Sequence, residues 1–229
     1  MKIYKHLYGD ENTPANIPVG YENVFEDAKK DIKKIAKEIK NDEINYLPPA
    51  LKVFNAFHMT PFNDVRVVII GQDPYYKPGL ANGLAFSCDS GVPPSLNNIY
   101  KEVKNCYPDF VIPKHGDLSP WCAQGVLLLN ISLTAKSGEA GYRPLLWMSF
   151  IDALIAALTN RKGKKKIIWV MWGAQAQKIG KLIAGKGIEL KAAHPSPANA
   201  HGGFIGCKHF SKINKILRKQ EEPEIDWTL

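Results

Sequence analysis

The sequence has few of the features that mark metal-dependent, disulfide-bonded or membrane-bound proteins. Its four cysteines are Cys88, Cys106, Cys122 and Cys207, and none of them forms a Cys-x-x-Cys pair, the spacing typical of zinc and redox sites. No apolar run approaches the roughly 20 residues of a membrane-spanning helix. The N-terminus also lacks the apolar core of a signal peptide. We therefore expect reduced thiols, no metal site, no membrane association and a cytoplasmic location, or a nuclear one if the source is eukaryotic or viral.

The nucleotide and nucleophile motifs of common enzyme classes are also absent. There is no Gly-x-x-x-x-Gly-Lys-Ser/Thr loop, no Gly-x-Gly-x-x-Gly after the first predicted strand and no Gly-x-Ser-x-Gly turn, which argues against P-loop, dinucleotide-binding and α/β-hydrolase chemistry. Positive charge is in excess, because 30 Lys and Arg residues against 22 Asp and Glu residues give a net charge of +8. The excess favours a polyanionic partner, nucleic acid first, with an inert basic surface as the alternative.

Apolar periodicity predicts an α/β fold. Strand-like runs alternate with segments of helical spacing, which favours a three-layer α/β/α arrangement around a central, mostly parallel four-stranded sheet. We expect one domain over 1–229, with an irregular segment at 1–22 and Ser95 as a helix N-cap. The predicted strands span 65–70, 126–129, 167–171 and 188–192, and the predicted helices span 24–40, 95–106, 147–158, 175–183 and 209–219.

Polar side chains follow three of the predicted strands at the point where each strand ends. Asp73 follows the first strand, Asn130 ends the second and His194 follows the fourth. Because parallel strands end at the same edge of a sheet, we expect these three side chains around one crevice. An Asp and a His without a nucleophilic Ser or Cys beside them favour chemistry on water. Asn130 offers both a donor and an acceptor, while Tyr75 and Phe86 offer faces for a planar ligand.

In a basic protein this set predicts a pocket for a nucleobase flipped out of DNA. Each member alone has a plainer interpretation: a polar turn after a core strand, a structural histidine, a strand-end cap or a core phenylalanine. Three segments rich in Pro or Gly suit DNA contact, because stiff turns, helix N-termini and glycine backbone approach phosphates closely. They span 92–95, 194–197 and 202–209.

These segments, in this order, resemble those of the family 1 uracil-DNA glycosylases. The likeness runs from about Phe54 to the end of the chain and rests on 71–75, 83–87, 93–96, 125–130, 194–197, 206–211 and 225–227. The resemblance implies base flipping and hydrolysis of the N-glycosidic bond of deoxyuridine in single- or double-stranded DNA. This is a step of base excision repair, and the family performs it with no metal or other cofactor.

The resemblance also implies a role for each matching residue. Asp73 would orient the attacking water and stabilise the cationic sugar, and His194 would stabilise the departing uracil anion. Four residues would bind the base: Gln72 through its backbone, Tyr75 against the methyl group of thymine, Phe86 by stacking and Asn130 by reading the uracil edge. The DNA contacts would come from Pro94, Ser95, Ser196, Pro197, Ala198, Asn199 and Lys208, with the two serines holding phosphates.

The chain departs from the family pattern in the loop that enters the base stack. Ala198 stands where a bulky Leu is usual and Gly202 where an Arg is usual, while Tyr76 replaces a usual His. A wedge needs apolar bulk, so we predict a preference for single-stranded or weakly paired uracil, with His201 as a candidate replacement wedge. The family also implies an acidic, DNA-mimicking inhibitor protein as a partner. Such inhibitors grip the Leu, so we predict weakened inhibition.

Two other functions stay open at this point. One is a DNA-binding replication or processivity module on the same scaffold, with catalysis secondary. The other is a small-nucleotide hydrolase. The intact pocket residues count against the first, and the lack of acidic metal clusters counts against the second. In each case we expect a monomer.

Overall fold

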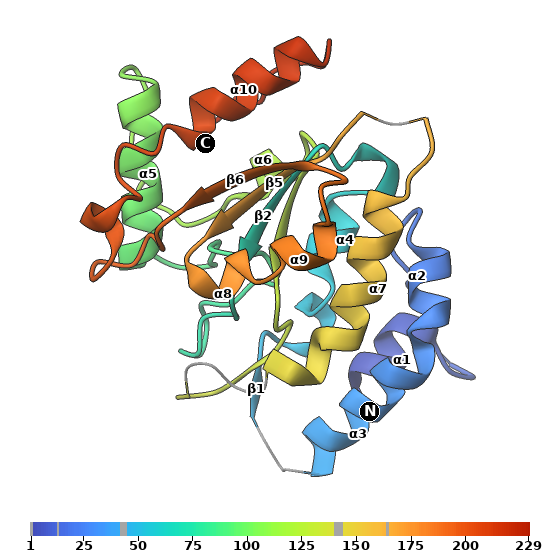
Figure 1. Cartoon of the computed structure of the whole chain (residues 1–229). Coiled ribbons are helices and arrows are strands. Elements are labelled where there is room, and N and C mark those ends of the chain that lie inside the picture. The colour runs from blue at the N-terminus through green and yellow to red at the C-terminus, as the bar shows by residue number, and fades with distance from the viewer. Residues whose placement is uncertain (1, 13, 42–44, 140–143, 164) are drawn as a thin grey trace.

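The computed structural model describes residues 2–12, 14–41, 45–139, 144–163 and 165–229. Its centre is a four-stranded sheet in the order β3-β2-β5-β6 (Figure 1), and its three pairings are all parallel. This confirms the predicted α/β fold with a parallel central sheet. The strands are β2 (Val67–Gly71), β3 (Val126–Asn130), β5 (Ile168–Trp172) and β6 (Ile188–Ala192).

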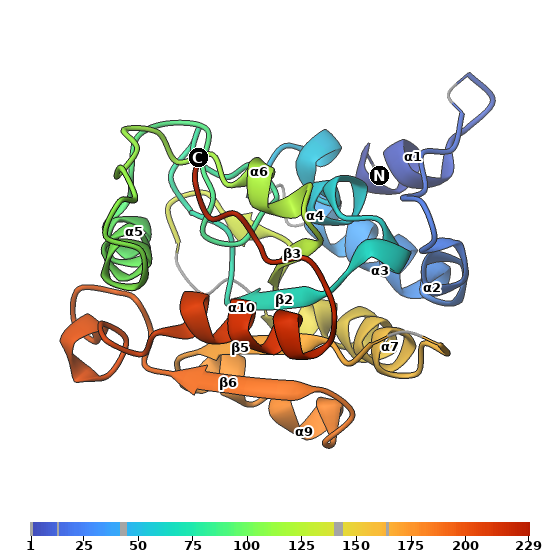
Figure 2. The same cartoon turned by 90° about the horizontal axis from the view of Figure 1, so that it is seen from above.

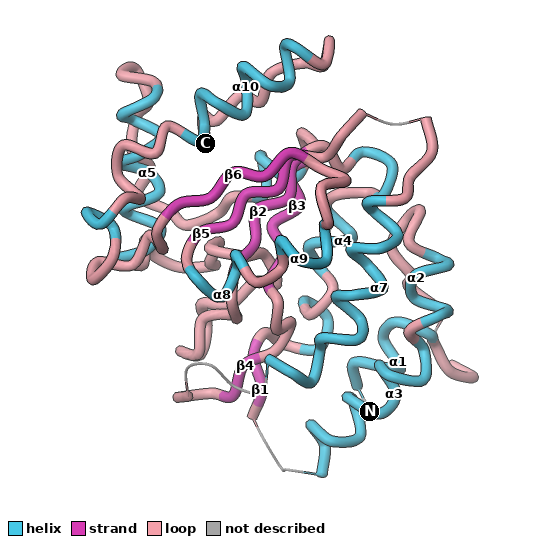
Figure 3. The backbone as a smooth tube through the Cα atoms, viewed as in Figure 1, coloured by secondary structure: helices cyan, strands magenta, loops and turns pink. Residues whose placement is uncertain are grey.

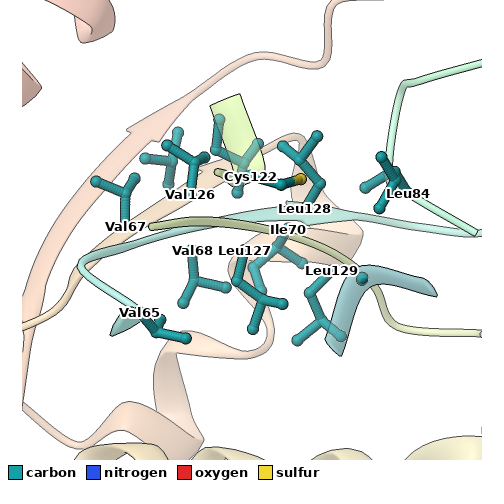
Figure 4. Packing of buried hydrophobic residues seen from close by; sticks show 14 of the residues in the cluster. Val65, Val67, Val68, Ile70, Leu84, Cys122, Val126, Leu127, Leu128 and Leu129 are labelled. Atoms are coloured by element: carbon teal, nitrogen blue, oxygen red, sulfur yellow. The ribbon is translucent and has the colours of Figure 1, made fainter. Parts of the chain in front are cut away.

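The burial of each strand follows from its sequence. Strands β2, β3 and β5 are continuously apolar up to their last residues and are buried along their whole length, as expected for a parallel sheet covered on both faces. In Figure 4, Val126 and Leu128 point to one side of the sheet while Leu127 and Leu129 point to the other. Strand β6 carries Glu189 and Lys191, is only half-buried, and forms an edge of the sheet.

Helices cover both faces of the sheet. Figures 1 and 2 show α10 over one face and α7 over the other, with α5 at the end towards which the arrowheads of β5 and β6 point. No helix within the described ranges is long and apolar enough to cross a membrane. The helices are α1 (Lys2–Tyr8), α2 (Glu22–Asp27), α3 (Lys29–Asn41), α4 (Asn55–Met59), α5 (Pro94–Cys106), α6 (Ser119–Cys122), α7 (Met148–Thr159), α8 (Ala174–Gln177), α9 (Gly180–Ile183) and α10 (His209–Lys219).

Short elements complete the chain. Strands β1 (Tyr46–Leu47) and β4 (Ala135–Lys136) form a separate antiparallel pair below the main sheet in Figure 3. Four 3₁₀ turns are η1 (Ala50–Lys52), η2 (Phe62–Asp64), η3 (Pro144–Trp147) and η4 (Ala200–Gly202). The four cysteines are free thiols, with Cys88 and Cys122 buried.

The structure corrects several predicted boundaries. The segment 1–22 is not wholly irregular, because α1 buries Ile3 and Leu7, which lie one helical turn apart. The helix predicted over 24–40 is divided at Ala28 into α2 and α3, and the one predicted over 175–183 is divided into α8 and α9. Ser95 is not an N-cap: α5 begins at Pro94 after Pro93, since proline costs no hydrogen bond in the first helical turn.

Candidate active site

A cavity of about 400 Å³ lies where β2 and β3 end and where the chain leaves β6. Its lining includes every residue predicted for catalysis or base binding, and also the two serines predicted to bind phosphates. The convergence predicted from the strand ends is therefore confirmed, while the role of each residue stays a prediction. The predicted residues in the lining are Gln72, Asp73, Tyr75, Phe86, Ser95, Asn130, His194 and Ser196.

The position of Asn130 depends on a glycine in the neighbouring strand. Gly71 is its partner in the β2–β3 ladder. A Cβ atom on Gly71 would lie 2.2 Å from Asn130 Oδ1 and 2.8 Å from the Ala85 side chain. Asn130 is 5% exposed, and a buried amide needs defined partners. The missing side chain at Gly71 thus leaves Asn130 the space in which its amide faces the cavity.

Tyr75 and Phe86 are fixed to each other by a hydrogen bond. The Tyr75 hydroxyl donates to the Phe86 carbonyl oxygen over 2.9 Å, and burial raises the pKa of Tyr75, so that the hydroxyl keeps its proton. Phe86 has a φ of 65°, which is uncommon for a residue with a side chain. The buried side chain of Asn82 supports this turn, because it accepts from the Leu84 N–H and donates to Ser87.

His194 is held as a neutral donor. Its Nδ1 accepts a hydrogen bond from the Ser196 N–H over 3.0 Å, which leaves the proton of the neutral ring on Nε2. Burial lowers the pKa of His194, and the nearby Asp73 opposes this shift only in part. The ring lies 6.0 Å from that of Phe86. Gly173, with a φ of 88°, allows the approach, because a Cβ there would lie 2.9 Å from the His194 Cβ.

The opposite wall of the cavity is organised by one polar stripe of α5. Ser95, Asn98 and Glu102 are spaced three and four residues apart, so they lie on the same face of the helix. Ser95 lines the cavity, and Asn98 donates to the Pro195 carbonyl oxygen over 2.9 Å. The N-terminus of α5 itself favours anions, because the first N–H groups of a helix have no acceptor within it.

Glu102, which the sequence did not point to, holds the backbone at Gly206 and Lys208. Its side chain is fully buried and accepts from the Gly206 N–H over 2.6 Å and the Lys208 N–H over 2.7 Å. A buried carboxylate costs free energy unless it is hydrogen-bonded, and these bonds compensate for that cost. The available signal was a polar residue one helical turn after Asn98 on a helix that is otherwise apolar on its buried side.

The predicted DNA-contact loop is exposed beside the cavity. Asn199 is tied back to Ser196, through a side-chain hydrogen bond of 3.1 Å and a backbone bond of 2.9 Å. Ala198 is exposed, and a Cβ on Gly202 would meet nothing within 4 Å. The side chain of His201 lies outside what the structure describes, so its suggested wedge role stays a prediction.

The predicted DNA contacts divide into two groups. Pro94 and Pro197 line a second cavity next to the first. Ala198, Asn199 and Lys208 are not among the described residues that line either cavity.

Among the residues that the structure describes, no group of three or more His, Cys, Asp or Glu side chains could hold a metal ion.

Comparison with known proteins agrees with this geometry. The family model described as the uracil DNA glycosylase superfamily matches residues 57–218. The chain belongs to this superfamily. Uracil-DNA glycosylase of Sodalis glossinidius (strain morsitans) is 50% identical over 185 residues, covering 79% of this chain and 81% of that protein. The protein of the same name from Proteus mirabilis (strain HI4320) is 47% identical over 202 residues, covering 86% and 88%.

Solved structures of the superfamily share the fold. A mimivirus UNG variant in complex with UGI superposes with a TM-score of 0.84 at 28% identity, covering 91% of this chain and 88% of that chain. The unsubstituted mimivirus uracil-DNA glycosylase gives a TM-score of 0.83 at 27% identity. The sheet and the helices described above are therefore arranged as in glycosylases of this superfamily.

The hydrogen bonds of Glu102 predict that replacing it will loosen the loop from Gly206 to Lys208. Glu102→Ala leaves two backbone N–H groups without their acceptor, at a cost of about 1–3 kcal/mol each. We expect a lower free energy of unfolding in urea and faster hydrogen exchange at the amides of Gly206 and Lys208. Glu102→Gln keeps one acceptor oxygen, so its free energy of unfolding and its amide exchange rates should lie between those of wild type and Glu102→Ala. Lys101→Ala, on the exposed face of α5, is the matched control. Unchanged exchange at both amides in Glu102→Ala would contradict this account.

Proposed function

We propose that this protein removes uracil from DNA by hydrolysing the N-glycosidic bond of deoxyuridine, a step of base excision repair. One observation carries the proposal: a single cavity at the sheet edge collects a carboxylate, an amide, an aromatic face and a neutral imidazole donor. Membership of the superfamily and the curated relatives near 50% identity support the same reaction.

Base recognition is assigned to the side of the cavity built on β2 and β3. Asn130 offers an acceptor and donors to the edge of uracil and rejects cytosine, whose donors and acceptors are exchanged at that edge. Phe86 provides the stacking face. Tyr75, fixed by its bond to the Phe86 carbonyl oxygen, blocks the volume that the methyl group of thymine would need.

Catalysis is assigned to Asp73 and His194. The C1′–N1 bond breaks and its electron pair leaves with uracil. Water adds its oxygen to C1′, and the proton that this water loses neutralises the uracil anion. Asp73 stabilises the positive charge that develops on the sugar and orients the water. His194 donates from Nε2 to the uracil oxygen as negative charge develops there, and it does so without being charged itself. Ser95 and Ser196 bind the flanking phosphates.

Four further expectations belong to the proposal. The protein acts as one domain, supported by the continuous buried cluster that runs from Ile3 to Trp227, and it acts as a monomer. It needs no cofactor. We place it in the cytoplasm, on the ground that the curated relatives named above come from bacteria.

Asp73→Asn should abolish turnover and keep DNA binding. The carboxylate acts in the transition state, so its loss lowers kcat by about 10²- to 10⁴-fold while binding changes little. The measurement is uracil release from a single-stranded oligonucleotide with EDTA present, with binding followed by fluorescence anisotropy. Wild-type activity that vanishes with EDTA, or full activity in Asp73→Asn, would contradict the proposal. Wild-type protein that binds the oligonucleotide but releases no uracil from it would favour a DNA-binding module instead.

The finer part of the proposal concerns the exposed loop at Ala198. A flipped base leaves a gap in the duplex, and a methyl group cannot fill the volume that a larger apolar wedge would fill. Single strands need no wedge, because their bases are already unpaired. We therefore assign this protein a preference for uracil in single-stranded or weakly paired DNA.

Ala198→Leu should raise activity on duplex DNA relative to single strands. The variant restores apolar bulk at an exposed position, so folding should be unaffected. The measurement is the ratio of kcat/KM for one uracil-containing strand with and without its complement, in wild type and variant. The single-strand rate is the internal control. If the ratio of kcat/KM on duplex to kcat/KM on single-stranded DNA is no higher in Ala198→Leu than in wild type, the assigned role of Ala198 is refuted.

Inhibition by an acidic, DNA-mimicking protein should be weaker than for relatives with Leu at the loop. The mimivirus neighbour was solved in complex with UGI. The positive net charge of this chain is complementary to an acidic partner. Ala198 and Gly202 offer it neither an apolar anchor nor a cation. Titration of activity with UGI should give a Kd that falls in Ala198→Leu. Complete inhibition of wild type at a one-to-one ratio would show the prediction to be wrong.

A further inference from the structure

A second cavity of about 550 Å³ adjoins the one that holds the catalytic residues. Three residues line both cavities, namely Tyr75, Tyr76 and Ser95, so the two cavities are neighbours. We call the second cavity the flanking groove. We infer that it binds the base of the nucleotide next to the flipped deoxyuridine, a subsite that rests on the function proposed above.

Ser95, which is proposed to hold a phosphate, lines both cavities. Ser95 lies in the first turn of α5, a helix of 13 residues, and its N-terminus favours anions. In a DNA strand one phosphate joins each nucleoside to the next. A phosphate held at Ser95, with uracil in the first cavity, therefore brings the neighbouring nucleoside to the groove.

The wall of the flanking groove combines an aromatic ring, apolar side chains and a cation. Tyr76 is a large aromatic side chain that is 39% exposed, and it stands beside apolar contributions from Leu80, Val92 and Pro93. Lys77 adds a cation to the same wall. An aromatic face with nearby positive charge is the arrangement by which proteins hold single-stranded bases without regard to sequence.

The backbone at Tyr76 is held by a hydrogen bond. Its carbonyl oxygen accepts from the Gly138 N–H over 2.8 Å, and Pro74 two residues earlier is buried. A stacking side chain on a fixed backbone loses less entropy on binding than one on a free loop.

The groove selects for an unpaired strand. A neighbouring base in a duplex is paired and stacked, and it must give up both interactions before it can enter. In a single strand the same base is free. The flanking groove therefore adds binding energy mainly on single strands, the substrates that an Ala198 loop can also serve.

The experiment removes the neighbouring base and the aromatic ring separately. Single-stranded oligonucleotides carry deoxyuridine with an abasic tetrahydrofuran residue at one adjacent position at a time, which keeps every phosphate. Each is tested for uracil release with wild type, Tyr76→Ala and Tyr76→Phe, and thermal unfolding confirms that the variants fold.

For wild type we expect one adjacent position at which the abasic residue lowers kcat/KM, roughly fivefold to 150-fold, the range for one stacked base. Tyr76→Ala should show the same loss on the normal oligonucleotide and no further loss on the abasic one. Tyr76→Phe keeps the ring and should behave as wild type. The inference is overturned if no adjacent position is sensitive, or if the losses from Tyr76→Ala and from the abasic residue simply multiply. Absence of uracil release from every oligonucleotide by wild type would instead refute the proposed function.

Discussion

The pairing of Gly71 with Asn130 at the end of the β2–β3 ladder is the contact on which the rest of the site depends. The ladder continues past the strands, because the Ile131 N–H donates to Gly71 and the Ser132 N–H donates to Gln72. The hydrogen bonds of the sheet thus extend into the segment that carries Asp73. A register shift of one residue would turn Asn130 to the other face of the sheet and remove the amide from the cavity.

The residues around the cavity are held in place from two sides, by the core of the sheet and by α5. On the sheet side, Asn130 and the turn that carries Phe86 are held by burial and by hydrogen bonds within the core. On the other side, α5 ties down the chain from Pro195 to Lys208 through Asn98 and Glu102. Ala198 and Gly202 both lie at exposed positions of this segment, outside the cavity lining. Substitution at such positions costs the fold little.

The sequence was sufficient for the parts of the fold governed by local pattern. Apolar runs predict most of the strands, and residues at or just beyond the ends of parallel strands lie at one edge of the sheet, which is why Asp73, Asn130 and His194 could be placed together. Helix ends were less predictable, because Pro94 in the first turn displaced Ser95 from the expected cap position. Glu102 could not be found in this way, since its partner Lys208 lies 106 residues further along the chain, and no local pattern records that distance.

The energetics of flipping connect the exposed loop with the flanking groove. Taking a base out of a duplex costs a few kcal/mol of pairing and stacking, and a wedge recovers part of this cost by filling the gap. A base stacked on an aromatic ring contributes about 1–3 kcal/mol, but in a duplex the neighbouring base would first have to leave its own stack. In the roles proposed for them, Tyr76 adds little binding energy on duplex DNA and Ala198 recovers little of the cost of flipping, whereas on a single strand the stacking at Tyr76 needs no base to leave a duplex. The two proposals therefore predict the same preference for unpaired substrates, although the residues lie on separate segments of the chain.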